Sequence, residues 1–171
     1  AAGLLSVERK YISDAIGALV ADERLVMEQG EIFLPMYYYS EVGVANKLRR
    51  MSKDGVTDIP DGFNVKEIET DGIVYDDVQI AAIETALRSR VMVLTGLPGT
   101  GKTTTTNGII AAMESFGKRV LCAAPTGRAA KRMSEATGKD AKTIHRLLGF
   151  TPSGGFEFNE DNPLVGDVLI V

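Results

Sequence analysis

The chain has 171 residues, 44% of them hydrophobic and 25% charged, which is an ordinary balance for one soluble globular domain or slightly more. No apolar run approaches the roughly 20 residues of a membrane helix, no signal peptide opens the chain, and Cys122 alone cannot form an internal disulfide, so we expect a cytoplasmic protein with no membrane partner. The net charge of -4 is unevenly distributed. Residues 118–146 carry eight cations and two acids and are therefore basic, whereas the rest of the chain has a net charge of -10.

The first part of the chain predicts a helix and a hairpin. Residues 7–21 form an amphipathic helix whose inner face carries Ile12, Ile16, Leu19 and Val20. Two apolar strands, residues 24–27 and 31–35, follow and are joined across Glu28-Gln29-Gly30. Because a helix followed by a hairpin is the back half of a winged-helix unit, residues 1–36 are predicted to be a partial winged-helix-like segment.

Residues 37–74 predict a second helix and a linker. The helix is expected to begin near Ser40, a plausible N-cap. Its inward face is predicted to carry Val44, Ala45, Leu48 and Met51. The tyrosines at 37–39 can stack on bases or pack between domains. Residues 52–72 are rich in Asp, Gly and Pro, which favours a linker or an irregular strand pair at the domain boundary.

From residue 75 onward helices and strands alternate. Helices are predicted at 76–89, 102–116, 126–137 and 141–149, and buried strands at 91–95, 119–125 and 167–171. Gly138 is expected to close the third of these helices, and residues 151–163 to form a surface excursion. Such a βαβ series predicts an α/β fold, with a parallel sheet and helices on both faces.

A phosphate-binding loop lies between the first strand and the next helix of this part. Residues 96–103, GLPGTGKT, match GxxxxGK[ST] in the strand-to-helix context that the motif requires. Lys102 is expected to reach the β- and γ-phosphates of ATP, and Thr103 to bind Mg²⁺, which makes these two the candidate catalytic residues. The predicted nucleotide-binding residues of the loop and helix start are Gly96, Pro98, Gly99, Thr100, Gly101, Lys102, Thr103 and Thr104.

Gln79 has two interpretations that its spacing does not separate. It stands three residues after Asp76, as the partner in a capping box would. Its amide can equally offer a donor and an acceptor to the edge of an adenine. Gln79 is therefore also a candidate nucleotide-binding residue.

A basic segment follows the second strand, at residues 124–132. Thr126 can cap the next helix and leave free N–H groups at the carboxyl edge of the sheet, where ligands of open α/β sheets bind. Arg128, Lys131 and Arg132 add positive charge. The segment suits a nucleic-acid phosphate, although a solvated cationic helix face is the other interpretation.

Three segments in this order resemble the RecD-like branch of superfamily 1 DNA helicases, the exodeoxyribonuclease V alpha subunit family. They are GLPGTGKTTTT at 96–106, APTGRAAKRM at 124–133 and KTIHRLLGF at 142–150, followed by NPLVGDVLIV at 162–171. Residues 15–51 are similar to the segment that precedes the motor in longer bacterial members. The resemblance implies that residues 75–171 are the N-terminal part of a RecA-like motor domain.

Residue roles follow from this resemblance. It implies an adenine contact for Gln79 and single-stranded DNA contacts for Thr126, Gly127 and Arg128. Thr143 and His145 fall in the next DNA-contact motif, although a lone histidine is more often a packed or capping residue. The implied partners are single-stranded and duplex DNA, with other recombination or repair subunits, and the implied unwinding polarity is 5′ to 3′.

The sequence departs from the family pattern at its end. In the family an Asp-Glu pair that holds Mg²⁺ follows the last strand, whereas Asp167 precedes it, so we expect a fragment with almost no ATP turnover of its own. Two other classes remain open: a small-molecule or nucleoside kinase, and a winged-helix regulator that senses nucleotide.

Overall fold

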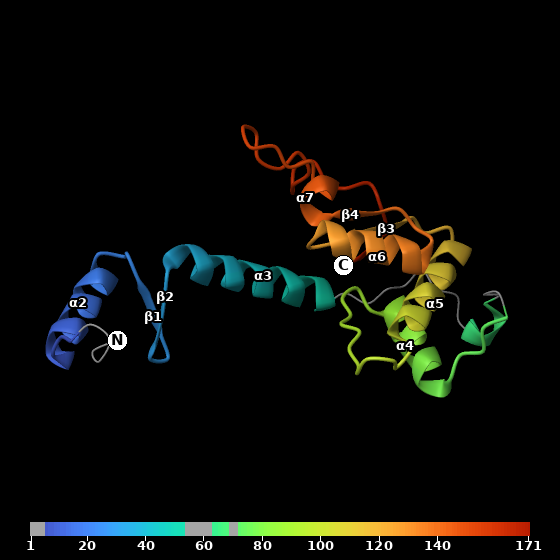
Figure 1. Ribbon diagram of the computed structural model, residues 1–171, viewed down its shortest axis with the longest axis horizontal. Helices are drawn as coiled ribbons and strands as arrows, with labels where there is room; N and C mark the ends of the chain where they lie inside the picture. The colour runs from blue at the N-terminus through green and yellow to red at the C-terminus, as the bar shows by residue number, and fades with distance from the viewer. Residues whose placement is uncertain (1–5, 54–62, 69–71) are drawn as a thin grey trace. The chain divides into compact units, whose positions relative to one another are not determined.

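The computed structural model describes residues 6–53, 63–68 and 72–171 (Figure 1). The chain forms two compact units, one up to Asp54 and one from Gly55 onward. In the part that the structure describes, no helix is long and apolar enough to cross a lipid bilayer.

The first unit begins with the predicted helix and hairpin. Helix α2 (Arg9–Ala21) has four half-buried residues, and they are the predicted ones: Ile12, Ile16, Leu19 and Val20. Strands β1 (Val26–Glu28) and β2 (Glu31–Phe33) pair antiparallel. Glu28 faces Glu31, so the turn consists of Gln29 and Gly30 alone, with φ values of 50° and 84°. Two successive positive φ angles are what a tight two-residue hairpin turn requires.

Helix α3 (Pro35–Lys53) differs from the prediction in its start and its exposure. It begins at Pro35, because a proline is preorganised for the first helical position, and Ser40 is therefore not its N-cap. The Ser40 hydroxyl instead donates to the carbonyl of Met36 at 2.7 Å, inside the helix. The residues predicted to point inward are all exposed: Val44, Ala45, Leu48 and Met51. A helical stripe is buried only where a second layer packs on it.

Tyr38 joins α3 to the hairpin. Its hydroxyl donates to Glu28 Oε1 at 3.0 Å, and its ring centroid lies 5.7 Å from that of Phe33. The hydrogen bond to the Glu28 carboxylate raises the pKa of Tyr38 above its usual value. The middle tyrosine of the run thus has a structural contact inside this unit.

The second unit has its hydrophobic core between α4 (Asp77–Arg88), α5 (Lys102–Ser115) and a 3₁₀ turn, η1 (Val65–Glu67). Val65 and Ile83 are fully buried, and the ring of Phe63 lies 4.7 Å from that of Phe116. The prediction of a linker over residues 52–72 is therefore wrong for residues 63–68, while residues 54–62 and 69–71 lie outside the described part. Three apolar residues of this otherwise polar segment lie in or against the core: Phe63, Val65 and Ile68.

Gly108 allows α4 and α5 to pack closely. A Cβ at Gly108 would come within 2.5 Å of Ile83 Cδ1 and 3.0 Å of the Tyr75 ring. A real Cβ essentially never comes as close as 2.5 Å to another atom, so a larger residue at position 108 would require the Ile83 side chain to shift.

A parallel sheet of three strands in the order β4-β3-β5 forms the other half of this unit. Its members are β3 (Val120–Ala124), β4 (Ala141–Thr143) and β5 (Val168–Ile170). Helix α6 (Gly127–Thr137) lies along β3 and β4, as Figure 1 shows, and Gly138 closes it with a φ of 68°. The predicted α/β class, with a parallel sheet, is confirmed.

Two sequence predictions for this half are wrong. Residues 91–95 form no strand, and Val93 is 83% exposed, because these residues are not hydrogen-bonded to β3, β4 or β5. Residues 141–149 are not one helix: β4 comes first, paired with β3, and the short helix α7 (Ile144–Leu147) follows it.

Candidate functional site

The phosphate loop turns on two glycines. Gly99 and Gly101 have φ values of 80° and 75°, in the left-handed region that glycine adopts without strain. Between them, both the amide and the hydroxyl of Thr100 donate to the carbonyl of Leu97, at 3.3 and 2.8 Å. Pro98 is exposed on the same loop. The loop is thus folded by local bonds and leads directly into α5.

Lys102, the first residue of α5, folds back onto the loop. Its ammonium donates to the carbonyls of Gly96 and Leu97, each at 2.7 Å. A cation held by neutral carbonyl oxygens has a stronger partner in a phosphate, whose charge shortens and strengthens the hydrogen bond. The loop therefore fits an anionic phosphate chain.

The threonines after Lys102 differ in their surroundings. Thr103 is exposed, as a ligand to a nucleotide-bound cation must be, and Thr104 is half-buried. Thr105 is buried, and its hydroxyl donates to the carbonyl of Gly101 at 3.1 Å. In the described part of the chain no group of three His, Cys, Asp or Glu side chains could hold a metal.

Gln79 has the structural placement that was predicted for it. The capping box is present: Gln79 Oε1 accepts from the Asp76 amide at 3.1 Å, and the Gln79 amide donates to Asp76 Oδ1 at 2.8 Å. The Nε2 atom of the same amide group lies beside the phosphate loop, where a Cβ on Gly101 would overlap it. The capping bond uses the amide oxygen, so the two N–H donors of Gln79 take no part in the cap.

A pocket of about 270 Å³ connects the start of α4 with the loop. Asp76, Val78 and Gln79 line it from α4 and its N-cap. Gly96, Thr100 and Lys102 line it from the loop and the start of α5. Four of the predicted nucleotide-binding residues therefore share one cavity, whereas the other five do not line it: Pro98, Gly99, Gly101, Thr103 and Thr104.

The predicted DNA-contact residues meet at the carboxyl edge of the sheet. Strands β3 and β4 are parallel, and Ala124 faces Thr143, so both chains leave the sheet at the same level. Thr126 caps α6 by accepting from the Ala129 amide at 3.3 Å, and Thr143 caps α7 by accepting from the Arg146 amide at 3.2 Å. Gly127, Arg128 and His145 are exposed beside them. Two segments that are separated by a whole helix in sequence thus form one surface.

His145 belongs to an aromatic cluster that the sequence analysis did not identify. Its ring centroid lies 5.4 Å from that of Phe150 and 5.9 Å from that of Phe156, and the two phenylalanines are 5.0 Å apart. An antiparallel bridge between Thr151 and Gly155 folds the surface excursion so that these rings meet. In the sequence, the only sign of this cluster is that Phe150 and Phe156 each follow a glycine. Their spacing alone does not predict a contact.

Asp167 lies at the opposite edge of the sheet. It precedes β5, and its Oδ2 accepts from the Arg119 amide at the start of β3, at 2.7 Å. Because both strands begin there, the carboxylate is distant from the carboxyl edge that carries Thr126 and Thr143. Asp167 thus has a structural role at the amino end of the sheet.

Known proteins are similar to nearly all of the chain or to parts of it. The family model described as an AAA domain matches residues 79–171, more than half of the chain. An ATP-dependent RecD2 DNA helicase of Deinococcus radiodurans is 36% identical over 170 residues, which are 97% of this chain and 23% of that protein. The RecBCD enzyme subunit RecD of Mycolicibacterium smegmatis is 41% identical over 118 residues, covering 54% of this chain and 21% of that subunit.

A phage protein is similar to a shorter part of the chain. The ATP-dependent DNA helicase dda of Enterobacteria phage T4 is 47% identical over 60 residues, which cover 34% of this chain and 14% of that helicase. The chain thus spans less than a quarter of the length of each of these three relatives. From the matched family and the near-complete coverage by a RecD2 relative, the chain belongs to the AAA domain family and is a RecD-like member of it.

Proposed function

We propose that the chain is the nucleotide-binding part of an ATP-dependent DNA helicase motor. Its phosphate loop would bind MgATP, and the carboxyl edge of its sheet would bind single-stranded DNA. The observation that carries the proposal is the register of β3 and β4, which brings the two segments that we predict to contact DNA to one edge of the unit that also holds the phosphate loop.

The nucleotide half rests on Lys102 and Gln79. The Lys102 ammonium would exchange the two loop carbonyls for phosphate oxygens, while Thr103 would hold Mg²⁺ and Gln79 would contact the base across the shared pocket. MgATP would supply the free energy of phosphoryl transfer. That supply is needed because separating DNA costs about 1.4 kcal/mol per base-pair step.

The DNA half rests on two capped segments. Thr126, Gly127 and Arg128 would grip one phosphate of a single strand with backbone N–H groups and a guanidinium, and Thr143 with His145 would contact the strand next to it. Such contacts position a strand without reading its sequence. Translocation from 5′ to 3′, a role in recombination or repair, and partner subunits are parts of the proposal that rest on the resemblance to RecD proteins.

The test measures how single-stranded DNA binding depends on salt. Arg128→Ala in the protein at its natural length should weaken binding of oligo-dT and of mixed sequences about equally, as followed by fluorescence anisotropy. The slope of log K against log salt should lose about 0.7, which corresponds to one phosphate contact on a single strand. ATP affinity without DNA should not change, because Arg128 is absent from the phosphate-loop pocket.

Arg88→Ala is the matched control, since Arg88 is an exposed arginine at the end of α4. It should leave the slope and the affinity as they are. If Arg128→Ala behaves like Arg88→Ala, the basic segment is a solvated helix face and the DNA half of the proposal fails. Binding of ATP with no affinity for any DNA would favour a kinase.

A further inference from the structure

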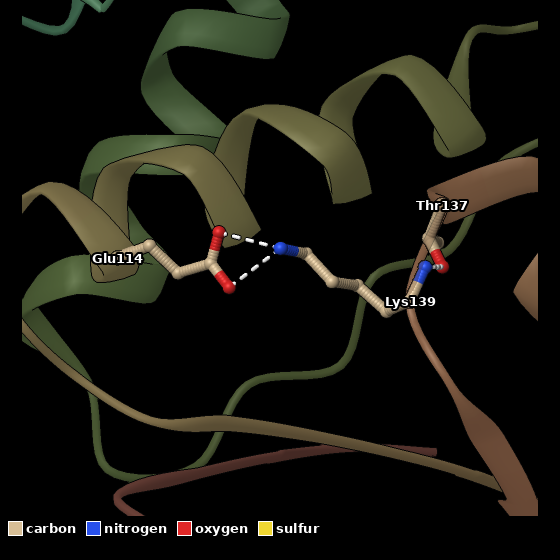
Figure 2. Close-up of polar contacts among 3 residues, drawn as sticks. All are labelled: Glu114, Thr137 and Lys139. Atoms are coloured by element: carbon tan, nitrogen blue, oxygen red, sulfur yellow. Dashed lines mark hydrogen bonds and ion pairs between the residues drawn. The ribbon is translucent and has the colours of Figure 1, made fainter.

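Two polar contacts join α5, the helix that follows the phosphate loop, to the C-terminal end of α6. Helix α6 begins at the carboxyl edge of the sheet. Asn107, in α5, donates through Nδ2 to the carbonyl of Ala136 in the last turn of α6, at 3.0 Å. Glu114, also in α5, forms an ion pair of 2.7 Å with Lys139, just after α6 (Figure 2). Residues 107 and 114 are about two helical turns apart, so both contacts use one face of α5.

The turn that receives these contacts is itself firmly attached to α6. The amide of Lys139 donates to Thr137 Oγ1 at 3.3 Å, and that hydroxyl donates to the carbonyl of Met133 at 2.7 Å. The amide of Ala141, the first residue of β4, donates to Ser134 Oγ at 2.9 Å. A displacement of α5 that pulls on Ala136 or Lys139 would therefore move α6 as a body.

The amide of Asn107 is oriented by its partner. A carbonyl oxygen can only accept, so the NH₂ group must face Ala136 and the oxygen must face the other way. Among the described residues no group donates to Asn107 Oδ1, although that atom is buried. An unsatisfied buried acceptor is unfavourable for stability.

Each of the two helices begins at one of the proposed ligand sites. Helix α5 starts with Lys102 in the phosphate loop, and α6 starts beside Thr126 and Arg128. Helix α5 packs on α6 and also on β3, so the contacts between α5 and α6 provide one physical connection between the two sites. We propose that Asn107 and the Glu114–Lys139 pair are positioning residues that couple nucleotide binding to DNA binding by moving α5 and α6 together.

This inference rests on the proposed function, and its readout is the coupling between the two ligands. The dissociation constant of a fluorescent, non-hydrolysable ATP analogue is measured with and without saturating oligo-dT, in the protein at its natural length. The ratio of the two constants is the coupling factor, for which about 5- to 150-fold is usual. Linkage requires the same factor when oligo-dT binding is measured with and without the analogue.

Two variants remove the contacts one at a time. Asn107→Asp keeps the shape and removes the donor to Ala136, and Glu114→Gln removes the charge that pairs with Lys139. Each should lower the coupling factor by about threefold or more, within the range known for residues between coupled sites. The affinity for each ligand alone should stay within about twofold of the parent value, because neither residue lies in a ligand site. A merely structural role would instead weaken both affinities and leave their ratio.

Glu135→Gln is the control variant. It breaks an ion pair of 3.8 Å with Lys131 that lies within α6 and is well exposed, so it leaves the α5 contacts intact. Its coupling factor should equal that of the parent. A carboxylate buried at position 107 would also destabilise the fold. Glu114 is half-exposed, so Glu114→Gln tests the inference independently of that effect.

The possible outcomes distinguish a failure of this inference from a failure of the proposed function. An unchanged coupling factor in folded Glu114→Gln and Asn107→Asp overturns the inference while the helicase proposal stands. A parent protein that binds both ligands with a factor of one also overturns it. A parent protein that binds no nucleotide or no single-stranded DNA overturns the proposed function itself.

Discussion

Replacing Gly101 by alanine tests how the phosphate loop and Gln79 are fitted together. Gly101 has a φ of 75°, and a Cβ there would overlap Gln79 Nε2. Gly99 has a φ of 80° and nothing within 4 Å of its would-be Cβ. Gly99→Ala is therefore a matched control that carries the same backbone strain without the collision.

The two variants should differ by the worth of one capping hydrogen bond. An alanine in the left-handed region costs about 1–2 kcal/mol, and the stiffer unfolded chain offsets about 0.4–1 kcal/mol, which leaves about 1 kcal/mol for Gly99→Ala. At Gly101 the new methyl also displaces the Gln79 side chain, which accepts from the Asp76 amide at 3.1 Å. A net hydrogen bond is worth about 1 kcal/mol, so Gly101→Ala should lose about 2 kcal/mol.

Urea unfolding followed by circular dichroism measures both losses, in the parent background and in Gln79→Ala. In the Gln79→Ala background the collision is gone, and the two glycine variants should lose the same free energy of unfolding. Equal losses in the parent background, or a difference that survives Gln79→Ala, would refute the placement of the Gln79 amide against the loop.

Four further outcomes are expected. Lys102→Ala should abolish tight ATP binding, because a charge-assisted hydrogen bond to phosphate is lost, and an unchanged affinity by calorimetry would contradict the site. Ile83→Ala should lower the free energy of unfolding by about 2–5 kcal/mol, since Ile83 is fully buried between α4 and α5; a loss below that range in urea would disprove its core position. Thr126→Ala should cost about 1 kcal/mol of stability by removing the N-cap of α6, whereas Thr126→Ser should cost little in the same assay. Burial raises the pKa of the Cys122 thiol, with Lys139 opposing the shift in part, so the folded protein should react slowly with a disulfide reagent near pH 8; rapid reaction without denaturant would exclude a buried thiol. Because the folded pKa is the higher one, the stability that Cys122 contributes should be lost as pH rises through that pKa, and Cys122→Ala should remove this dependence.

The sequence by itself determined the features that depend on neighbouring residues. The glycine turn that leads into α5, the Thr126 cap and the Gly138 stop were predicted and are present, and so is the capping box of Asp76 and Gln79, which was one of two interpretations; the strand expected before the phosphate loop is absent. Caps and turns are formed by groups three or four residues apart, so their chemistry is complete within a short segment. The same reason explains why α2, α4, α5 and α6 were found within about two residues of their ends.

Only the tertiary structure decided which segments pair and which are covered. Residues 91–95 have the composition of a strand but no hydrogen-bonded neighbour, whereas Ala141–Thr143 look helical in sequence and become a strand because β3 lies beside them. Val65 belongs to the core, although its segment is rich in polar residues, because it packs with apolar residues of α4 and α5. The pairing of Ala124 with Thr143, and the hydrogen bond of Asn107 to Ala136, likewise depend on chain segments that are distant in sequence. Pairing and burial are interactions between such segments, and a local pattern carries no information about its partner.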